Sequence, residues 1–83
     1  MTDNSKKLFN FLLNHAGEHV TAIDVAEETG LATGTVNLLF NNFIKKGWGR
    51  RTIATVEYEN GSQGEVKFLY LTDEGMKLNP DDD

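Results

Sequence analysis

The stretch VTAIDVAEETGLATGTVNLLFNNFIKKG, residues 20–47, contains the start and stop signals of two consecutive helices. Thr21 is a favourable N-cap for the first helix, because its hydroxyl can accept a hydrogen bond from an early backbone N–H group. Asp24 follows three residues later, where its carboxylate can accept a hydrogen bond from the backbone of the cap residue. Gly30 is expected to end this helix, since glycine adopts the left-handed conformation of a helix end without a steric penalty. A first helix capped at Thr21 and closed at Gly30 is therefore predicted.

A second and longer helix is predicted after a short turn. Leu31 lies in that turn, where we expect it to anchor in the core. Thr33 is the expected N-cap, and the helix runs to about Lys46 before Gly47 ends it. Apolar residues at three- and four-residue spacing predict its buried face: Val36, Leu39 or Phe40, and Phe43. Two helices joined by a tight glycine turn constitute a helix-turn-helix.

The opposite face of the second helix is rich in asparagine and threonine. Its residues are Gly34, Thr35, Asn37, Leu38, Asn41, Asn42 and Lys45. Asparagine can pair bidentately with adenine in the major groove of DNA, and threonine can contact the methyl group of thymine. Three asparagines are unexpected on a merely polar surface, because asparagine has only a middling helix propensity. This composition favours DNA contact, although the face has no arginine and Leu38 is apolar.

A further helix is predicted before the motif. A cap at Asn4 or Ser5 begins it, it runs to about Ala16, and Gly17 ends it. Its apolar residues cover more than half of the helix circumference. Part of this surface is expected to lie behind the helix-turn-helix, and the excess at one edge, Phe11, is a candidate interface residue.

His15 and His19 are four residues apart, a spacing that suits a metal site only on one continuous helix. Gly17 lies between them and is expected to stop the helix, and no third ligand is nearby. We therefore interpret both histidines as exposed loop residues and predict no metal site.

A β-hairpin is predicted C-terminal to the motif. Residues 52–59 and 65–71 are rich in β-branched and aromatic side chains, and the glycine-rich residues 60–64 form a five-residue turn between them. Both faces of the second strand are apolar, whereas a two-stranded hairpin normally buries one face. The second face, which includes Phe68 and Tyr70, therefore needs a cover from a helix or from another subunit.

The length of 83 residues corresponds to one small domain. A cap at Thr72 or the next residue predicts one further helical turn over residues 73–78. We expect a single domain over residues 1–83, with an ordered core of about 5–78 and an acidic tail over 79–83.

The composition excludes several classes of protein. The chain has no cysteine, so disulfides and thiolate metal sites are not available. Its apolar segments are short and broken by charges, which excludes a membrane span. The N-terminus does not resemble a signal peptide, so a cytoplasmic location is expected. No phosphate-binding glycine loop and no cluster of histidine with carboxylates is present, and we expect neither an enzyme nor a cofactor.

The net charge is −5, from 13 acidic and 8 basic residues. A protein that binds nucleic acid is more often basic, because neutralising phosphates supplies most of the non-specific affinity. The acidic residues are unevenly distributed. Up to Arg51 there are six basic and five acidic residues, whereas the remainder has two basic and eight acidic residues. The acidity is therefore mainly a property of the C-terminal part.

Three segments resemble the winged-helix family of DNA-binding domains. VTAIDVAEETGLATGTV resembles the family's helix-turn-helix pattern, IKKGW its step from the second helix into the wing, and FLYLTDEG the end of the wing's last strand in prokaryotic regulators. The resemblance covers roughly residues 6–78. It implies an α+β fold with a three-helix core, a two-stranded β-hairpin wing and a short C-terminal helical turn. Ala32 stands where the family usually has a serine N-cap, so Thr33 is expected to substitute for it.

The same resemblance implies a transcriptional regulator that binds double-stranded DNA. The second helix of the motif would lie in the major groove, with base contacts from Thr33, Thr35, Asn37, Leu38 and Asn41. Contacts to phosphates, or from the wing to the backbone or minor groove, would come from Lys45, Lys46, Arg50, Arg51, Gln63 and Lys67. Such regulators usually dimerise on two-fold sites. Phe11, or the apolar hairpin face with Phe68 and Tyr70, could supply the contact between subunits.

An alternative hypothesis is a winged helix that binds another protein, as an adaptor or a subunit of a complex, without binding DNA. The negative net charge and the arginine-free helix face favour it. Exposed apolar residues favour it as well: Ile23, Leu38 and Ile44.

Overall fold

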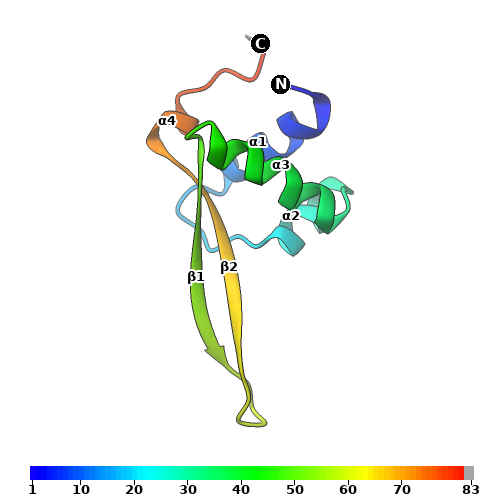
Figure 1. Ribbon diagram of the computed structural model, residues 1–83. Helices are drawn as coiled ribbons and strands as arrows, with labels where there is room; N and C mark the ends of the chain where they lie inside the picture. The colour runs from blue at the N-terminus through cyan, green and yellow to red at the C-terminus, as the bar shows by residue number, and fades with distance from the viewer. Residues whose placement is uncertain (82–83) are drawn as a thin grey trace.

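The computed structural model describes residues 1–81 and shows three helices, a β-hairpin and a short last helix. The elements are α1 (Asp3–Asn14), α2 (Ala22–Thr29), α3 (Thr33–Lys45), β1 (Gly49–Glu57), β2 (Gln63–Leu71) and α4 (Asp73–Met76). The helices gather at one end, and the hairpin projects away from them (Figure 1). The α+β class, the three-helix core, the hairpin and the short C-terminal helix are confirmed. The predicted acidic tail includes Asp82 and Asp83, which lie outside the described residues.

Helix α2 has the predicted signals at both ends. The Thr21 hydroxyl accepts a hydrogen bond from the backbone N–H of Asp24 at 3.2 Å, and the Thr21 N–H donates to the Asp24 carboxylate at 3.0 Å. This reciprocal pair is a capping box. Gly30 follows with φ 78°, in the left-handed region that glycine tolerates. The start and the end of α2 are thus determined by local sequence.

The predicted caps of α1 and α3 are wrong. Helix α1 is capped by Thr2 rather than by Asn4 or Ser5, because the Thr2 hydroxyl accepts a hydrogen bond from Ser5 N–H, and the helix therefore begins at Asp3. This helix also ends earlier than expected, at Asn14. In α3 the cap position is Ala32, whose carbonyl already accepts from Val36 N–H, so Thr33 is the first helical residue. The Ala32 side chain makes no capping hydrogen bond.

The core lies where the three helices meet the base of the hairpin. Its buried residues are Leu8, Phe9, Leu12, Val20, Val25, Val36, Phe40, Phe43, Leu69 and Leu71. Val36, Phe40 and Phe43 confirm the predicted apolar stripe of α3. Leu31 and Leu39 are only partly buried and pack against the edge of this core. The exposed side of α3 is therefore turned away from the rest of the molecule.

The two strands pair antiparallel from Gly49 opposite Leu71 to Glu57 opposite Gln63. The connecting loop has the predicted five residues but begins two positions earlier, at Tyr58. Asn60 accepts a hydrogen bond from Ser62 N–H at 3.0 Å, and Gly61 has φ 84°, so the chain reverses there and Gln63 already belongs to β2. The first strand also begins earlier than predicted, at Gly49.

The base of the hairpin is held against the end of α3 by close contacts of two glycines. A Cβ atom on Gly49 would lie 2.8 Å from the Phe40 ring, and one on Gly75 would lie 2.2 Å from the Trp48 carbonyl oxygen. The Thr72 hydroxyl donates to the carbonyl of Gly47 at 2.6 Å and caps α4 by accepting from Gly75 N–H. These contacts fix the direction in which the hairpin leaves the helices.

Candidate nucleic-acid interface

The outward face of α3 carries four of the predicted contact residues. Asn37, Leu38, Asn41 and Lys45 are all exposed, and Leu38 is 64% exposed. At 100° per residue these side chains share one side of the helix, opposite the buried stripe. Helix α3 therefore presents a continuous strip of amide, aliphatic and cationic groups to the solvent.

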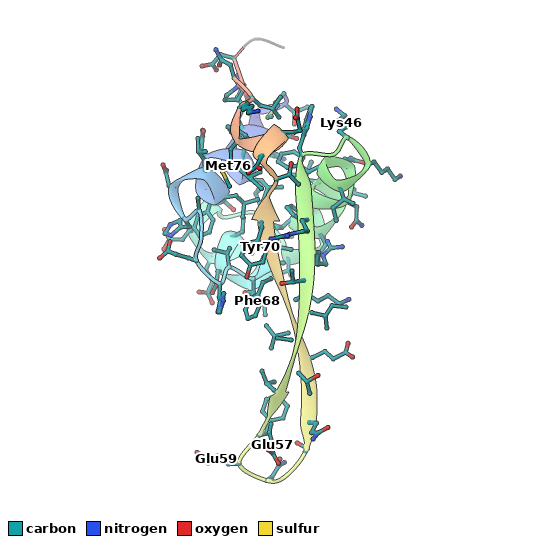
Figure 2. The ribbon with its side chains drawn as sticks, turned by 90° about the vertical axis from the view of Figure 1, so that its left-hand side faces the viewer. Lys46, Glu57, Glu59, Phe68, Tyr70 and Met76 are labelled. Atoms are coloured by element: carbon teal, nitrogen blue, oxygen red, sulfur yellow. The ribbon has the colours of Figure 1, made fainter. Side chains whose placement is uncertain are left out.

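The remaining predicted residues of α3 lie at the margins of this strip. Thr33 is exposed in the first turn, and Thr35 is half-buried. Lys46, which follows the helix, has its ammonium group 4.7 Å from the centre of the Trp48 ring. It borders a hollow that also contains Met1 and Thr2, and it lies at the end of the molecule opposite the tip of the wing (Figure 2). Lys46 therefore lies outside the exposed strip of α3, whose last residue is Lys45.

Arg51 of β1 joins the outward face of α3. Its Nη1 donates a hydrogen bond to Oδ1 of Asn41 at 3.0 Å, and its guanidinium lies 5.4 Å from the centre of the Phe40 ring. An arginine from the hairpin thereby supplies the guanidinium that the sequence of α3 lacks. Because the Asn41 oxygen is already bonded, the amide NH₂ of Asn41 is the group left for an external acceptor.

Arg50 lies on the other face of the hairpin. Neighbouring side chains in a strand point to opposite faces, so Arg50 and Arg51 diverge. The Arg50 guanidinium is 5.6 Å from the centre of the Tyr70 ring. The structure therefore does not bring Arg50 together with the residues of α3.

The far half of the wing is mainly acidic. Gln63 and Lys67 are exposed as expected, with Gln63 paired to Glu57 at the last rung of the hairpin. Glu57 and Glu59 lie at the tip (Figure 2), and Glu65 is exposed two residues before Lys67. An open hollow of about 410 Å³ separates this half of the wing from the N-terminal ends of α2 and α3. Lys67 and Asn37 both line that hollow, so the far half of the wing and α3 border the same opening.

The two histidines both stack on aromatic rings. His15 is half-buried at the end of α1, 4.4 Å from the Phe11 ring centre, and forms an ion pair with Glu18 when protonated. His19 is exposed, as predicted, and lies 4.7 Å from the Phe68 ring centre. Among residues 1–81 no group of three metal-binding side chains is placed to hold a metal ion.

The surfaces predicted to join two subunits are partly covered within the chain. Phe11 and Phe68 are half-buried beneath the two histidines, and Tyr70 is half-buried beneath Arg50. A homodimer through these residues stays a prediction. None of the helices over residues 1–81 has the length and apolar character needed to cross a membrane.

No family model and no curated protein matches the sequence. Among solved structures, a MepR A103V mutant from an S. aureus clinical isolate superposes with a TM-score of 0.76 at 23% identity, over 94% of this chain and 51% of that one. The S. aureus MepR–DNA complex superposes with a TM-score of 0.74 at 22% identity, over 93% of this chain and 57% of that one. The PcaV transcriptional regulator of Streptomyces coelicolor, in complex with its natural ligand, superposes with a TM-score of 0.64 at 22% identity, over 93% of this chain and 49% of that one.

The fold is a winged helix-turn-helix. At these identities the likeness shows the fold, and it extends through all three helices and the wing. This chain spans about half the length of the matched regulators. The family resemblance of the three sequence segments is confirmed at the level of the winged-helix fold.

Proposed function

We propose that this winged helix binds double-stranded DNA and acts as a transcriptional regulator, with α3 in the major groove. The observation that carries this proposal is the placement of Arg51 beside Asn41 on the outward face of α3. Arginine is the commonest side chain to recognise guanine, and here it stands next to an amide donor on an exposed helix. The likeness to a regulator whose structure is a complex with DNA supports the same conclusion.

The proposed base contacts follow from the chemistry of the exposed strip. The free NH₂ of Asn41 can donate to N7 or O6 of guanine or to N7 of adenine, and Arg51 retains further N–H donors for guanine. Asn37, one helical turn before Asn41, makes no side-chain hydrogen bond to any residue among 1–81 and can pair bidentately with adenine. Leu38 lies between them, and its apolar side chain suits the methyl group of thymine. Thr33 and Thr35 would approach the groove from the first turn.

The proposed phosphate contacts lie at the end of α3 and along the wing. Lys45 ends the exposed strip, where phosphates flank a helix lying in the major groove. Lys67 and Gln63 are the proposed contacts farther along the wing. Lys46 and Arg50 lie away from the strip, so we expect them to reach only phosphates at the margins of the site.

Binding, rather than catalysis, is the proposed activity, and it needs no cofactor. The proposal includes a single domain over the whole chain and a cytoplasmic location, where the DNA of a prokaryote lies.

A salt titration of binding to duplex DNA tests the proposal. The logarithm of the affinity should fall linearly with the logarithm of salt concentration, and replacing Lys45 with alanine should reduce the slope by about 1. The exposed Lys7 on α1 is a matched control, because it lies on a different helix, and Lys7→Ala should leave the slope unchanged. A protein that binds no duplex at low salt contradicts the proposal. If Leu38→Glu then abolishes a complex with another protein, the protein-binding alternative replaces it.

A further inference from the structure

The two edges of the hairpin differ in how they are protected. The β2 edge is bonded at Leu69, whose N–H donates to the Val20 carbonyl at 2.7 Å, and it carries the charged Glu65 and Lys67. On β1, residues 52–56 have the sequence TIATV, without a charge or a proline, and the pairing register shows no bulge there. Edge strands of monomeric proteins are normally blocked by charges, proline or bulges. The β1 edge has none of these over five residues.

Backbone hydrogen bonds at the two ends of the hairpin show which β1 residues bond to β2 and which have backbone groups on the free edge. Tyr58 N–H donates to the Ser62 carbonyl at 2.8 Å, and Thr72 N–H donates to the Trp48 carbonyl at 2.9 Å. Hydrogen-bonded and non-hydrogen-bonded residue pairs alternate in an antiparallel ladder. The backbone N–H and C=O groups of even-numbered β1 residues therefore bond β2, and those of odd-numbered residues point away from β2, toward the free edge. The outward set comprises Arg51, Ile53, Thr55 and Glu57.

Within the part of the chain that the structure describes, no backbone group outside the hairpin bonds to these four residues. In both views the far half of the hairpin extends clear of the helices (Figures 1 and 2). Ile53 is 60% exposed in the middle of this edge. The β1 edge is therefore accessible, and the backbone N–H and C=O groups of the outward set are available for hydrogen bonding.

We propose that the β1 edge pairs antiparallel with the β1 edge of a second copy of this chain, about a two-fold axis at Ala54. In this register Arg51 of each copy lies opposite Glu57 of the other, and Ile53 lies opposite Thr55. All these residues belong to the outward set, so each rung exchanges two backbone hydrogen bonds. The charges at the two ends of the paired segment are complementary by symmetry.

Charge complementarity selects this register over its neighbours. Two-fold axes at residues 53 or 55 would also match donors to acceptors, but they would leave at least one of Arg51 and Glu57 without an opposite charge. Arg51 can keep its bond to Asn41, because a guanidinium has five N–H donors. Pairing also produces a four-stranded sheet from two hairpins, and sheets of three or more strands are stable where isolated hairpins are marginal.

The second copy would also extend the apolar face of the hairpin. Thr52 would lie opposite Val56 of the second copy, and Ala54 opposite its own equivalent, on the face that contains Phe68 and Tyr70. The face that the sequence predicts to be covered by another subunit would thus become continuous across the dimer.

A cysteine cross-link tests the register directly, because the chain has no cysteine of its own. At a non-bonded rung the two Ala54 Cα atoms would be about 4.5 Å apart, within the range for a disulfide. Ala54→Cys should therefore form a disulfide dimer under mild oxidation. Thr52→Cys is the matched control, because the two Thr52 positions would be about 13 Å apart in the dimer and should form no disulfide. Equal cross-linking of the two variants, or none in either, would overturn the proposal.

Sedimentation equilibrium of the full chain, without DNA, tests the charge pairing independently of the proposed function. The wild type should dimerise, and Glu57→Arg should raise the dimer dissociation constant by about tenfold or more, since both symmetric pairs become repulsive. The double variant Arg51→Glu with Glu57→Arg restores opposite charges and should recover most of the affinity. Neither Glu57 nor Arg51 belongs to the buried core, and Arg51→Glu alone, which also removes the bond to Asn41, is the control for the double variant. A wild-type chain that is monomeric at every concentration, or a double variant no tighter than Glu57→Arg, would contradict the proposal.

Discussion

Nη1 of Arg51 on β1 and Oδ1 of Asn41 on α3 are 3.0 Å apart, and this hydrogen bond links the wing to the outward face of α3. The bond has two consequences for the proposed DNA binding. It holds a guanidinium on a face whose own sequence contains no arginine, and it leaves the Asn41 NH₂ as the free end of the amide. The two side chains are therefore expected to act as one unit.

We predict that Arg51→Ala and Asn41→Ala each weaken binding to a selected DNA sequence by about 1–3 kcal/mol. The double variant should lose less than the sum of the two, because either single change already disrupts the unit. Fluorescence anisotropy with the three variants gives the double-mutant cycle. Arg50→Ala is the control, since Arg50 lies on the opposite face, and it should show no coupling to Asn41. Additive losses for Arg51 and Asn41 would show that they contact DNA independently.

The acidic wing tip is predicted to weaken DNA binding. Glu59 and Glu65 are exposed on the far half of the wing, so in the proposed complex their carboxylates would repel the phosphates of the duplex. Glu59→Gln and Glu65→Gln should each increase the affinity at low salt, and the increase should shrink as salt is added. Glu18→Gln, on the loop between α1 and α2, is the matched control and should have a smaller effect. An unchanged affinity in both wing variants would place the wing tip away from DNA.

Gly75 is predicted to be intolerant of any side chain. A Cβ atom there would lie 2.2 Å from the Trp48 carbonyl oxygen, so the last helix would have to move away from the end of α3. Gly75→Ala should lower the free energy of unfolding by about 1–3 kcal/mol, measured by urea denaturation. Gly34→Ala is the matched control, because the space around Gly34 is open and alanine favours a helix, so it should stabilise the protein by about 0.5–1 kcal/mol. Equal effects of the two changes would argue against the close packing at Gly75.

The uncapped start of α3 offers a stabilising substitution. Ala32 occupies the cap position with φ −69° and ψ 146° but has no side-chain acceptor. Ala32→Ser should raise the free energy of unfolding by about 1 kcal/mol, because its hydroxyl can accept from a free N–H of the first turn. Thermal unfolding measures the gain, and Thr33→Ser is the control because residue 33 is already helical. A gain with Thr33→Ser alone would mean that the helix begins one residue later.

Features that depend on neighbouring residues could be predicted from the sequence. The capping box of Thr21 and Asp24, the left-handed Gly30 and the stripe of Val36, Phe40 and Phe43 each follow from spacing along one helix. The start of α3 could not be predicted so well, because the residue that becomes the cap depends on how the preceding turn leaves Gly30. Ala32 took that position although Thr33 is the better capping residue.

The candidate site was only partly predictable, because its main contact joins two elements. Asn41 and Arg51 are ten residues apart, and their hydrogen bond exists only once β1 folds back beside α3. The two-residue period of a strand does predict that Arg50 and Arg51 point to opposite faces. Which arginine lies beside α3 then depends on which face of the hairpin is buried. Leu69 and Leu71 are on the buried face, and Arg51, which pairs with Leu69, lies on that face as well.

The most direct test of α3 as the DNA-binding helix is an NMR titration of the whole chain with a duplex of selected sequence. Side-chain amide signals of Asn37 and Asn41, the Arg51 guanidinium signal and the Leu38 methyl signals should shift together at saturation. The Asn10 and Asn14 amides of α1 provide an internal control and should move least. Shifts that cluster on α1 and leave the four α3-side signals unchanged would contradict the account, and so would no shift at low salt.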